Sequence, residues 1–297
     1  MKKTNKIQAT LIGSSAILMW AFLALLTTMA GTIPSFQLVA MAFTIAFFLA
    51  FGKWITRNEN ILSHLKLPAK VWALGIIGLF GYHFLYFQAL ANAPPVEAGL
   101  IAYLWPLLIV VFSGLLPGEQ LQRTHVFGAL AGLVGTYVLV TSGGRLSAFN
   151  SNFAFGYILA GLCAMTWAGY SLLSRRIGHI STDSIGGFCG ATAILAWGMH
   201  FGFETTIWPS GLSSWLAVLG LGLGPVGAAF YTWDIGTKHG DIQVLGALSY
   251  AAPLLSTLIL ILAGKGELTW SVFSAGLLIT GGALFASKNM LKRRQIG

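Results

Sequence analysis

Charged residues are scarce in this chain. They make up 8% of its 297 residues, whereas an average soluble domain carries about 25%. Hydrophobic residues make up 56%, and the mean hydropathy is +0.78. So few polar side chains cannot cover the surface of a soluble fold of this length. We therefore expect lipid to surround most of the molecule.

Cysteine and recognisable catalytic motifs are also scarce. The two cysteines, Cys163 and Cys189, lie in apolar segments, so neither a disulfide framework nor a CxxC metal site is indicated. The sequence has no HExxH pattern, no nucleotide-binding loop and no grouping of two carboxylates with a histidine. These absences argue against a membrane enzyme and an ATP-driven pump, and we expect no metal and no cofactor.

Long apolar runs are what the chain does contain. A membrane-spanning chain must satisfy its own backbone hydrogen bonds, so it forms helices or a closed barrel. Barrel strands are short and alternate apolar with polar residues, whereas these runs have the length of about 20 residues that a helix needs to cross the bilayer. We predict an all-α integral membrane protein with ten transmembrane helices, at about residues 9–30, 35–52, 71–91, 96–116, 125–142, 153–173, 184–204, 213–237, 243–263 and 269–288.

The positive charges predict the orientation of these helices. Of the 17 lysines and arginines, 15 fall on one side of the predicted membrane and two, Arg145 and Lys265, on the other. Because cytoplasmic loops are rich in Lys and Arg, both termini should be cytoplasmic and the protein multi-pass. The formal net charge of +9 then follows from topology, and no nucleic-acid partner is expected.

An internal repeat divides the chain at an offset of 147 residues. The pattern Gly99-x-x-x-Tyr103-x-x-Pro106-Leu107-Leu108 recurs as Gly246-x-x-x-Tyr250-x-x-Pro253-Leu254-Leu255. We predict two halves of five helices, residues 1–147 and 148–297. Five is odd, so the second half enters the membrane inverted. Inverted repeats are typical of secondary transporters, whose substrate site lies near the midplane.

Several motifs carry a family resemblance over nearly the whole chain. They are Met19-Trp20-Ala21, the run from Ala89 to Ala98, Pro106 followed by Gly118-Glu119, and Pro253 followed by Gly266-Glu267. The chain resembles the drug/metabolite transporter superfamily in its EamA-type exporter branch, and within it the bacterial aromatic amino-acid exporters. The resemblance implies a transporter of the bacterial cytoplasmic (inner) membrane. The sequence departs from the pattern of this family at one place. Many members carry an arginine early in the second helix, and this chain has none between Pro34 and Phe51.

Two prolines lie deep inside predicted spans. Pro106 and Pro253 each remove one helical hydrogen bond and push away the carbonyl four residues earlier. In lipid this is tolerated where a neighbouring helix or a wet cavity meets the exposed polar groups. We expect kinks that line a central cavity. The alternative is simple helix curvature without contact to a ligand.

Aromatic side chains gather in the middle of several predicted spans. Tyr82 and Tyr86 share a helix face with His83 nearby. Tyr103 and Trp105 diverge by about 200° on a regular helix, so both reach one cavity only if the helix is distorted or the cavity is wide. The alternative is an aromatic belt at the membrane interface. The predicted substrate-binding residues are Trp20, Tyr82, His83, Tyr86, Tyr103, Trp105, Pro106, Trp167, Tyr170, Tyr250 and Pro253.

His83 is the ionisable residue nearest the middle of a span. Such residues are expensive in lipid and are functional candidates by default. An imidazole changes its charge near neutral pH, so His83 could hydrogen-bond the substrate or carry a proton between states. The alternative is a structural role, in which a neutral imidazole forms a hydrogen bond with a neighbouring backbone or hydroxyl group.

Other ionisable residues have structural explanations. Glu97 opens a predicted helix, where a carboxylate is favourable, although a role at the outer mouth is the alternative. Asp234 and Lys238 are four residues apart and predict an ion pair. His200 and Glu204 have the same spacing near the outer end of a span, and we expect them to pair at the surface.

Glycines at a spacing of three to four residues predict close helix packing. Gly128, Gly132 and Gly135 form one such face, and small residues let helix backbones approach closely in lipid. The contact lies either within the molecule or between two copies. We therefore predict a monomer or a weak dimer.

These features together predict a secondary active exporter of amino acids, with aromatic amino acids as the best single substrate class. The substrate would cross by alternating access through a central cavity lined by aromatic residues. The alternatives within transport are a broad-specificity exporter of small metabolites or drugs and a facilitative amino-acid carrier. The expected partners are a small-molecule substrate and the lipid bilayer.

Overall fold

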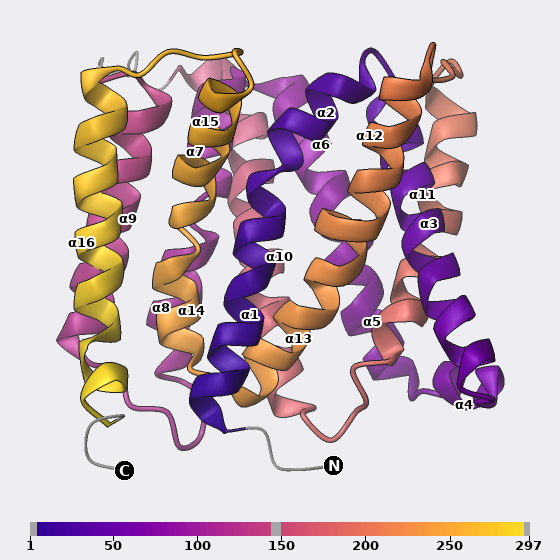
Figure 1. The fold of residues 1–297 in the computed structure, drawn as a ribbon, viewed down its shortest axis with the longest axis horizontal. Helices are drawn as coiled ribbons and strands as arrows, with labels where there is room; N and C mark the ends of the chain where they lie inside the picture. The colour runs from indigo at the N-terminus through magenta and orange to yellow at the C-terminus, as the bar shows by residue number, and fades with distance from the viewer. Residues whose placement is uncertain (1–4, 144–149, 294–297) are drawn as a thin grey trace.

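The protein is a bundle of helices that run side by side (Figure 1). The computed structural model describes residues 5–143 and 150–293. Within these ranges every regular element is helical. The elements are α1 (Lys6–Ala21), α2 (Leu23–Ala30), α3 (Ser35–Thr56), α4 (Ile61–Leu65), α5 (Ala69–Ile76), the π-helix η1 (Ile77–Gly81), α6 (Tyr82–Asn92), α7 (Pro95–Ala102), α8 (Trp105–Ser113), α9 (Arg123–Val140), the 3-10 helix η2 (Ser151–Phe153), α10 (Ala154–Arg176), α11 (Ser184–Phe203), α12 (Leu212–Leu223), the π-helix η3 (Gly224–Ala228), α13 (Ala229–His239), α14 (Ile242–Leu248), α15 (Ala251–Leu262) and α16 (Trp270–Arg293).

Nine helical stretches within the described residues are long and apolar enough to cross a membrane. They coincide with nine of the ten predicted spans to within a few residues. The tenth prediction, 184–204, corresponds to α11, a helix of 20 residues that packs against α3. Glycines and His200 lower the hydropathy of α11. The prediction of an all-helical, multi-pass membrane protein is confirmed.

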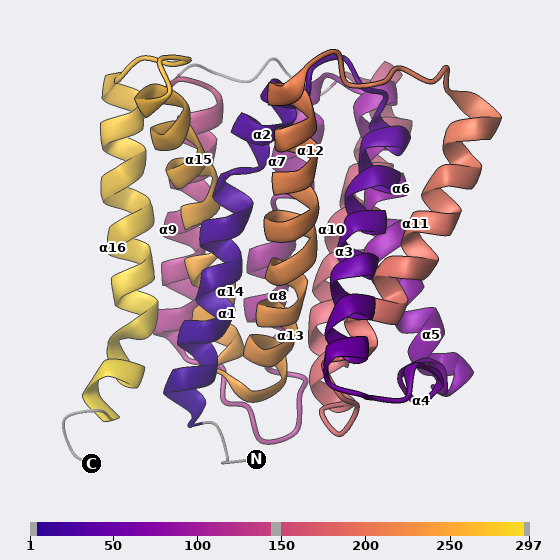
Figure 2. The same cartoon turned by 45° about the vertical axis from the view of Figure 1, so that its right-hand side comes forward.

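The two ends of the bundle differ in charge. The start of α1 and the end of α16 lie at one end, together with the starts of α5, α9, α11 and α14 (Figures 1 and 2). We call it the basic end, because it holds Lys6, Lys53, Arg57, Lys66, Lys70, Arg123, Arg175, Arg176, Lys238 and Lys288. Lys265 lies at the opposite end, between α15 and α16. Lys2, Lys3, Arg145 and Arg294 lie outside the described residues.

Breaks interrupt the helices on the N-terminal side of both predicted kink prolines. The segment that holds Pro106 stops being helical between Ala102 and Trp105. The segment that holds Pro253 is broken in the same way between Leu248 and Ala251. A proline has no N–H to donate and clashes with the preceding turn. The helices are therefore interrupted at the predicted places, and a role of these breaks in lining a cavity stays a prediction.

Two π-helical segments were not predicted. One, Ile77–Gly81, joins α5 to α6, and the other, Gly224–Ala228, joins α12 to α13. The second contains Pro225, which cannot donate to the regular helical ladder. Single π turns inside α-helices occur frequently at functional sites.

The glycine face of α9 is used within the molecule. A Cβ added at Gly128 would lie 2.5 Å from the Gly282 carbonyl oxygen of α16, and one at Gly132 would lie 2.6 Å from the Tyr250 ring. A similar approach joins α1 to α13, where a Cβ at Gly13 would lie 2.7 Å from the Gly236 Cα. The pairs α9 and α16, and α1 and α13, pack so closely because glycines without side chains meet at these contacts.

The predicted ion pairs form, but one of them is not at the surface. Lys238 Nζ lies 2.8 Å from the Asp234 carboxylate. His200 Nδ1 lies 2.9 Å from Glu204, yet the His200 side chain is fully buried. The expectation of a surface pair was wrong because the Glu204 carboxylate also accepts hydrogen bonds from the Phe36 and Gln37 backbone N–H groups. The carboxylate thereby satisfies two N–H groups in the first turn of α3, which have no partner within the helix.

Candidate functional site

Four tryptophans from four helices meet in the core of the bundle. Every pair among them is in ring contact, with centroids 5.1 to 6.3 Å apart. We call this group the tryptophan cluster. Its members are Trp20 of α1, Trp105 of α8, Trp167 of α10 and Trp233 of α13. Most of the contacts are edge-to-face or tilted, which is the geometry that aromatic rings prefer.

Hydrogen bonds hold two of these indoles. The Trp20 N–H donates to the Pro225 carbonyl oxygen at 3.0 Å, in the π-helical segment η3. The Trp233 N–H donates to the Ser171 hydroxyl at 3.1 Å. No hydrogen bond joins the Trp105 or Trp167 N–H to another described residue. The cluster therefore has two fixed rings and two indole donors that a ligand can use.

Tyrosines extend the cluster along α6. The Tyr82 ring lies 5.3 Å from Trp167 and stacks on Tyr86 at 6.2 Å, with an interplanar angle of 4°. Tyr103 lies in the break between α7 and α8, two residues before Trp105. Within the described residues, none of these three hydroxyls donates a hydrogen bond to another group. Each is free to meet a polar group of a ligand.

His83 is oriented by the other π-helical segment. Its Nδ1 lies 2.7 Å from the Leu79 carbonyl oxygen, and its ring packs edge-on against Phe43 at 5.3 Å. A carbonyl oxygen only accepts, so Nδ1 carries the proton and Nε2 of the neutral ring is an acceptor. The backbone contact fits the structural interpretation of His83, while the acceptor at Nε2 stays available to a ligand.

The other predicted site residues divide into two groups. Tyr170 packs on Trp167 at 5.3 Å, and Pro106 is buried beside the cluster in the α8 turn that carries Trp105. Tyr250 belongs to a different core, against Gly132 of α9 and residues of α16. Pro253 lies in the first turn of α15, three residues after Tyr250, and is half-buried. The structure therefore does not bring Tyr250 to the tryptophan cluster.

Sequence reasoning missed three aromatic residues of this site. Trp233 completes the cluster, and Phe230, one turn earlier, lies 5.8 Å from Trp167. Phe43 stacks on Phe230 at 5.7 Å. A signal for Trp233 existed, because it aligns with Tyr86 at the offset of 147 (233 − 86 = 147). Phe43 and Phe230 look like ordinary apolar residues of a span.

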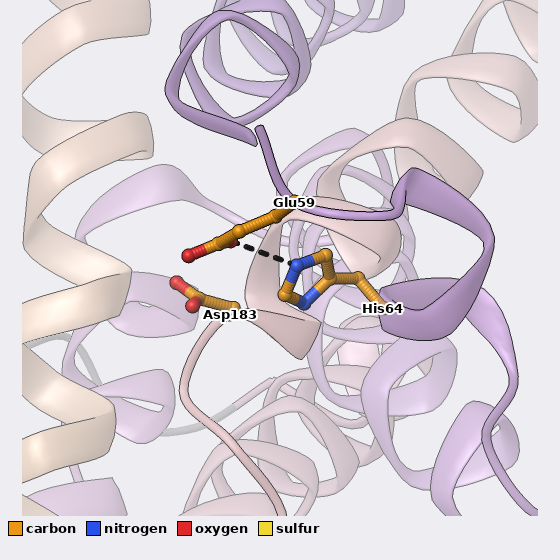
Figure 3. A group of neighbouring side chains, drawn as sticks. All are labelled: Glu59, His64 and Asp183. Carbon is orange, nitrogen blue, oxygen red and sulfur yellow. Dashed lines mark hydrogen bonds and ion pairs between the residues drawn. The ribbon is translucent and has the colours of Figure 1, made fainter. Parts of the chain in front are cut away.

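A separate polar group lies at the basic end. The ligand atoms of Glu59, His64 and Asp183 lie within 4.8 Å of one another (Figure 3). His64 Nε2 is 2.9 Å from Glu59, and Lys53 makes an ion pair with Asp183. Arg57 adds a longer ion pair to Glu59, at 3.9 Å. Basic side chains of the chain itself therefore balance both carboxylates.

Comparison with known proteins identifies the family. The EamA-like transporter family matches residues 8–141 and 154–288. The aromatic amino acid exporter YddG of Ancylobacter novellus is 51% identical over 98% of this chain and 100% of its own length. The aromatic amino acid exporter YddG of Escherichia coli is 25% identical, over 93% and 96%. The pseudopaline exporter CntI of Pseudomonas aeruginosa is 24% identical, over 88% and 87%.

A solved crystal structure has the same fold. It is 51% identical in sequence, and the TM-score is 0.90 over 95% of this chain and 98% of the other. The family match covers most of the chain, and both kinds of relative align over nearly all of it. The chain therefore belongs to the EamA-like transporter family and is a multi-pass membrane transporter rather than an enzyme.

Proposed function

We propose that this protein exports aromatic amino acids across the bacterial cytoplasmic membrane by alternating access. The observation that carries the proposal is the tryptophan cluster with unpartnered hydroxyl and indole groups beside it. The name of the 51% identical relative, an aromatic amino acid exporter, supports this substrate class.

The chemistry of the site suits both ends of such a substrate. An aromatic ring is attracted to the faces and edges of Trp167, Tyr82 and Tyr86. The substrate ammonium can lie over an indole face or donate to His83 Nε2. The carboxylate can accept from the Tyr103 hydroxyl or the Trp105 indole. An aliphatic amino acid satisfies the polar groups but leaves the aromatic wall without a partner.

The halves 1–147 and 148–297 are proposed to be inverted repeats of five helices each. The two π-helical segments support this, because they begin at residues 77 and 224, which are 147 apart (224 − 77 = 147). The family also matches once within each half. Helix packing follows the same offset. The helices α1 and α13 pack on each other, and so do their counterparts α10 and α6. By the same offset, α3 pairs with its counterpart α11, and α9 pairs with its counterpart α16.

Two groups of helices meet at the tryptophan cluster. Around α1 lie α13, α14 and α15, and around α10 lie α6, α7 and α8. We call them the α1 bundle and the α10 bundle. Trp20 and Trp233 come from the first, and Trp105 and Trp167 from the second. Rocking one bundle against the other would move these rings apart on alternate sides of a substrate.

The basic end is proposed to face the cytoplasm. This end carries ten of the lysines and arginines whose side chains the structure describes, and the opposite end carries Lys265. Cytoplasmic loops of membrane proteins are enriched in these residues. Both termini would then be cytoplasmic.

Reconstituted transport tests the proposal. Proteoliposomes loaded with unlabelled phenylalanine should take up labelled phenylalanine, tyrosine or tryptophan by counterflow, with saturable kinetics. Threonine, methionine and a cationic dye should compete weakly. Transport of a non-aromatic metabolite, with none of the three aromatic amino acids carried, would reject the substrate class. Uptake without saturation or counterflow would indicate a channel.

Energy coupling through His83 is a separate proposal. No nucleotide motif occurs in the sequence, so a gradient must drive any uphill transport. If His83 carries the proton, the His83→Gln variant loses uphill transport driven by a pH gradient but keeps downhill counterflow. Uphill transport that survives with its pH dependence would eliminate His83 as the coupling residue and leave the substrate site intact.

A further inference from the structure

Four charged side chains at the basic end lie where the α1 and α10 bundles meet. Lys6 stands at the start of α1, and Asp241 precedes α14, so both belong to the α1 bundle. Arg175 lies in the last turn of α10, and Glu119 lies in the loop that follows α8. Two positive and two negative side chains therefore lie together at the contact between the two bundles.

Within each bundle the opposite charges are paired. The Lys6 Nζ lies 3.1 Å from the Asp241 carboxylate. Arg175 makes an ion pair with Glu119, whose side chain is 8% exposed. Asp241 is held further, because its N–H donates to the Thr10 hydroxyl at 2.8 Å and its carboxylate accepts from the Val244 N–H.

Other contacts cross from one bundle to the other. The Arg175 guanidinium donates to the carbonyl oxygens of Thr237 at 2.7 Å and Gly240 at 3.0 Å. These carbonyls lie at the C-terminal end of α13, where helix carbonyls lack an intrahelical partner and the helix dipole attracts a cation. Lys6 lies 3.9 Å from Glu119. Separating the bundles at this end must break all of these contacts together.

Among the described residues, no ion pair at the opposite end corresponds to this set. At the offset of 147, Arg175 corresponds to Thr28 (175 − 147 = 28) and Asp241 corresponds to Pro94 (241 − 147 = 94). The Thr28 hydroxyl donates only to the Ala24 carbonyl of its own helix, and Glu267 is exposed. If the halves are related by symmetry, the ion pairs belong to one end alone.

We propose that Lys6, Glu119, Arg175 and Asp241 form an ionic gate that closes the basic end, in which Arg175 links α10 to the end of α13. The inference rests on the proposed alternating access. It assigns to this set the task of favouring the conformation that is closed at the basic end. Opening toward the cytoplasm then requires the Arg175 hydrogen bonds to α13 to break before substrate can reach the tryptophan cluster from that side.

Cysteine accessibility tests the gate without any transport assay. Ser174 is buried and lies two turns beyond Trp167 on α10, toward the basic end. The reporter is Ser174→Cys in a background with Cys163 and Cys189 replaced by alanine. Inside-out vesicles are treated with a membrane-impermeant maleimide. We expect Arg175→Gln to raise the labelling rate about tenfold, because hydrogen bonds to a charged group are lost.

The matched control is Arg176→Gln. Arg176 is the exposed neighbour, and its contact to the Leu115 carbonyl is long, at 3.4 Å. This control should label at the parent rate. Glu119→Gln provides a second test, because it removes the pair with Arg175 and weakens the contact with Lys6. Labelling in both Arg175→Gln and Glu119→Gln at the rate of the Arg176→Gln control would overturn the ionic gate.

Transport kinetics separate a gate from a purely structural role. A larger share of the cytoplasm-open conformation lowers the apparent KM for substrate on that side, because apparent affinity scales with the competent fraction. We expect the KM of Arg175→Gln to fall severalfold, whereas a loosely folded variant loses maximal rate without gaining affinity. The labelling assay needs no substrate, so a wrong substrate class leaves the test of the gate intact.

Discussion

The two ends of the bundle are built differently, although their helices continue into one another. At the basic end, six of the seven residues of α14 and seven of the eleven residues of α13 are buried. Toward the opposite end, only two of the twelve residues of α15 and one of the eight residues of α2 are buried. Protein contacts therefore cover these helices more completely at the basic end than at the opposite end. Closure and ligand contact can thus be changed by separate mutations.

The largest effect is expected at the tryptophan cluster, between the two ends. Trp167→Ala removes a buried ring that contacts the three other tryptophans, and truncation of a buried Trp costs about 3 to 5 kcal/mol. Thermal unfolding of the purified protein measures the loss, and counterflow should be abolished. Trp208→Ala is the control, because Trp208 is exposed and should change stability by about 0.5 kcal/mol or less. Equal effects of the two substitutions would contradict a central role for the cluster.

The next effect tests packing at the basic end. Gly13→Ala places a methyl group 2.7 Å from the Gly236 Cα, and overpacking costs about 1 to 3 kcal/mol. The expected result is a lower unfolding temperature, measured by thermal denaturation. In Gly161→Ala nothing lies within 4 Å of the new methyl group, so this control should be neutral or slightly stabilising. An unchanged Gly13→Ala protein would show that α1 and α13 are not closely packed.

A smaller effect tests the hydroxyl groups beside the cluster. The Tyr86 hydroxyl makes no hydrogen bond within the described residues, so Tyr86→Phe should leave the unfolding temperature unchanged. It should raise the KM severalfold, since one hydrogen bond to a ligand contributes about 0.5 to 1.5 kcal/mol. Tyr157→Phe is the control. It loses the hydrogen bond from the Tyr157 hydroxyl to Glu97, so it should lower the unfolding temperature without changing the KM. The reverse pattern would exclude Tyr86 from the site.

The smallest effect is expected for the polar group of Figure 3. Asp183→Asn removes an ion pair with Lys53, whose side chain is 32% exposed. Ion pairs exposed to this degree contribute about 0 to 1 kcal/mol. Thermal unfolding should therefore shift only slightly, and counterflow should stay at the parental rate. A loss of transport in this variant would give the group a role that its charge balance does not indicate.

Much of the fold followed from hydropathy and breakers. The lengths of the apolar runs predicted the helices, and Pro106 and Pro253 predicted the breaks before them. The π-helical segments were not predictable, because a widened turn leaves the apolar pattern unchanged. Pro225 marks one of them only in retrospect. His200 was misplaced because its burial depends on Glu204, whose carboxylate bonds to the distant start of α3.

The candidate site was predicted from residue type and from depth along the span, and neither of these specifies the direction in which a side chain points. Trp20, Trp105 and Trp167 meet as expected for residues near the middle of their spans. Tyr250 was included because it repeats Tyr103, yet its ring packs into the space that Gly132 leaves on α9. The repeat predicts equivalent positions along the chain, whereas the direction of each side chain depends on which neighbour is small.

Saturation-transfer NMR on the purified protein tests most directly whether the tryptophan cluster holds the substrate ring. Irradiation of the protein should transfer saturation most strongly to the ring protons of phenylalanine, and excess tryptophan should compete. The transfer should persist in Gly161→Ala and disappear in Trp167→Ala, provided that this variant is folded at the temperature used. Equal transfer to the protons of leucine, or transfer to phenylalanine that a folded Trp167→Ala protein retains, would contradict the assignment of the cluster as the substrate site.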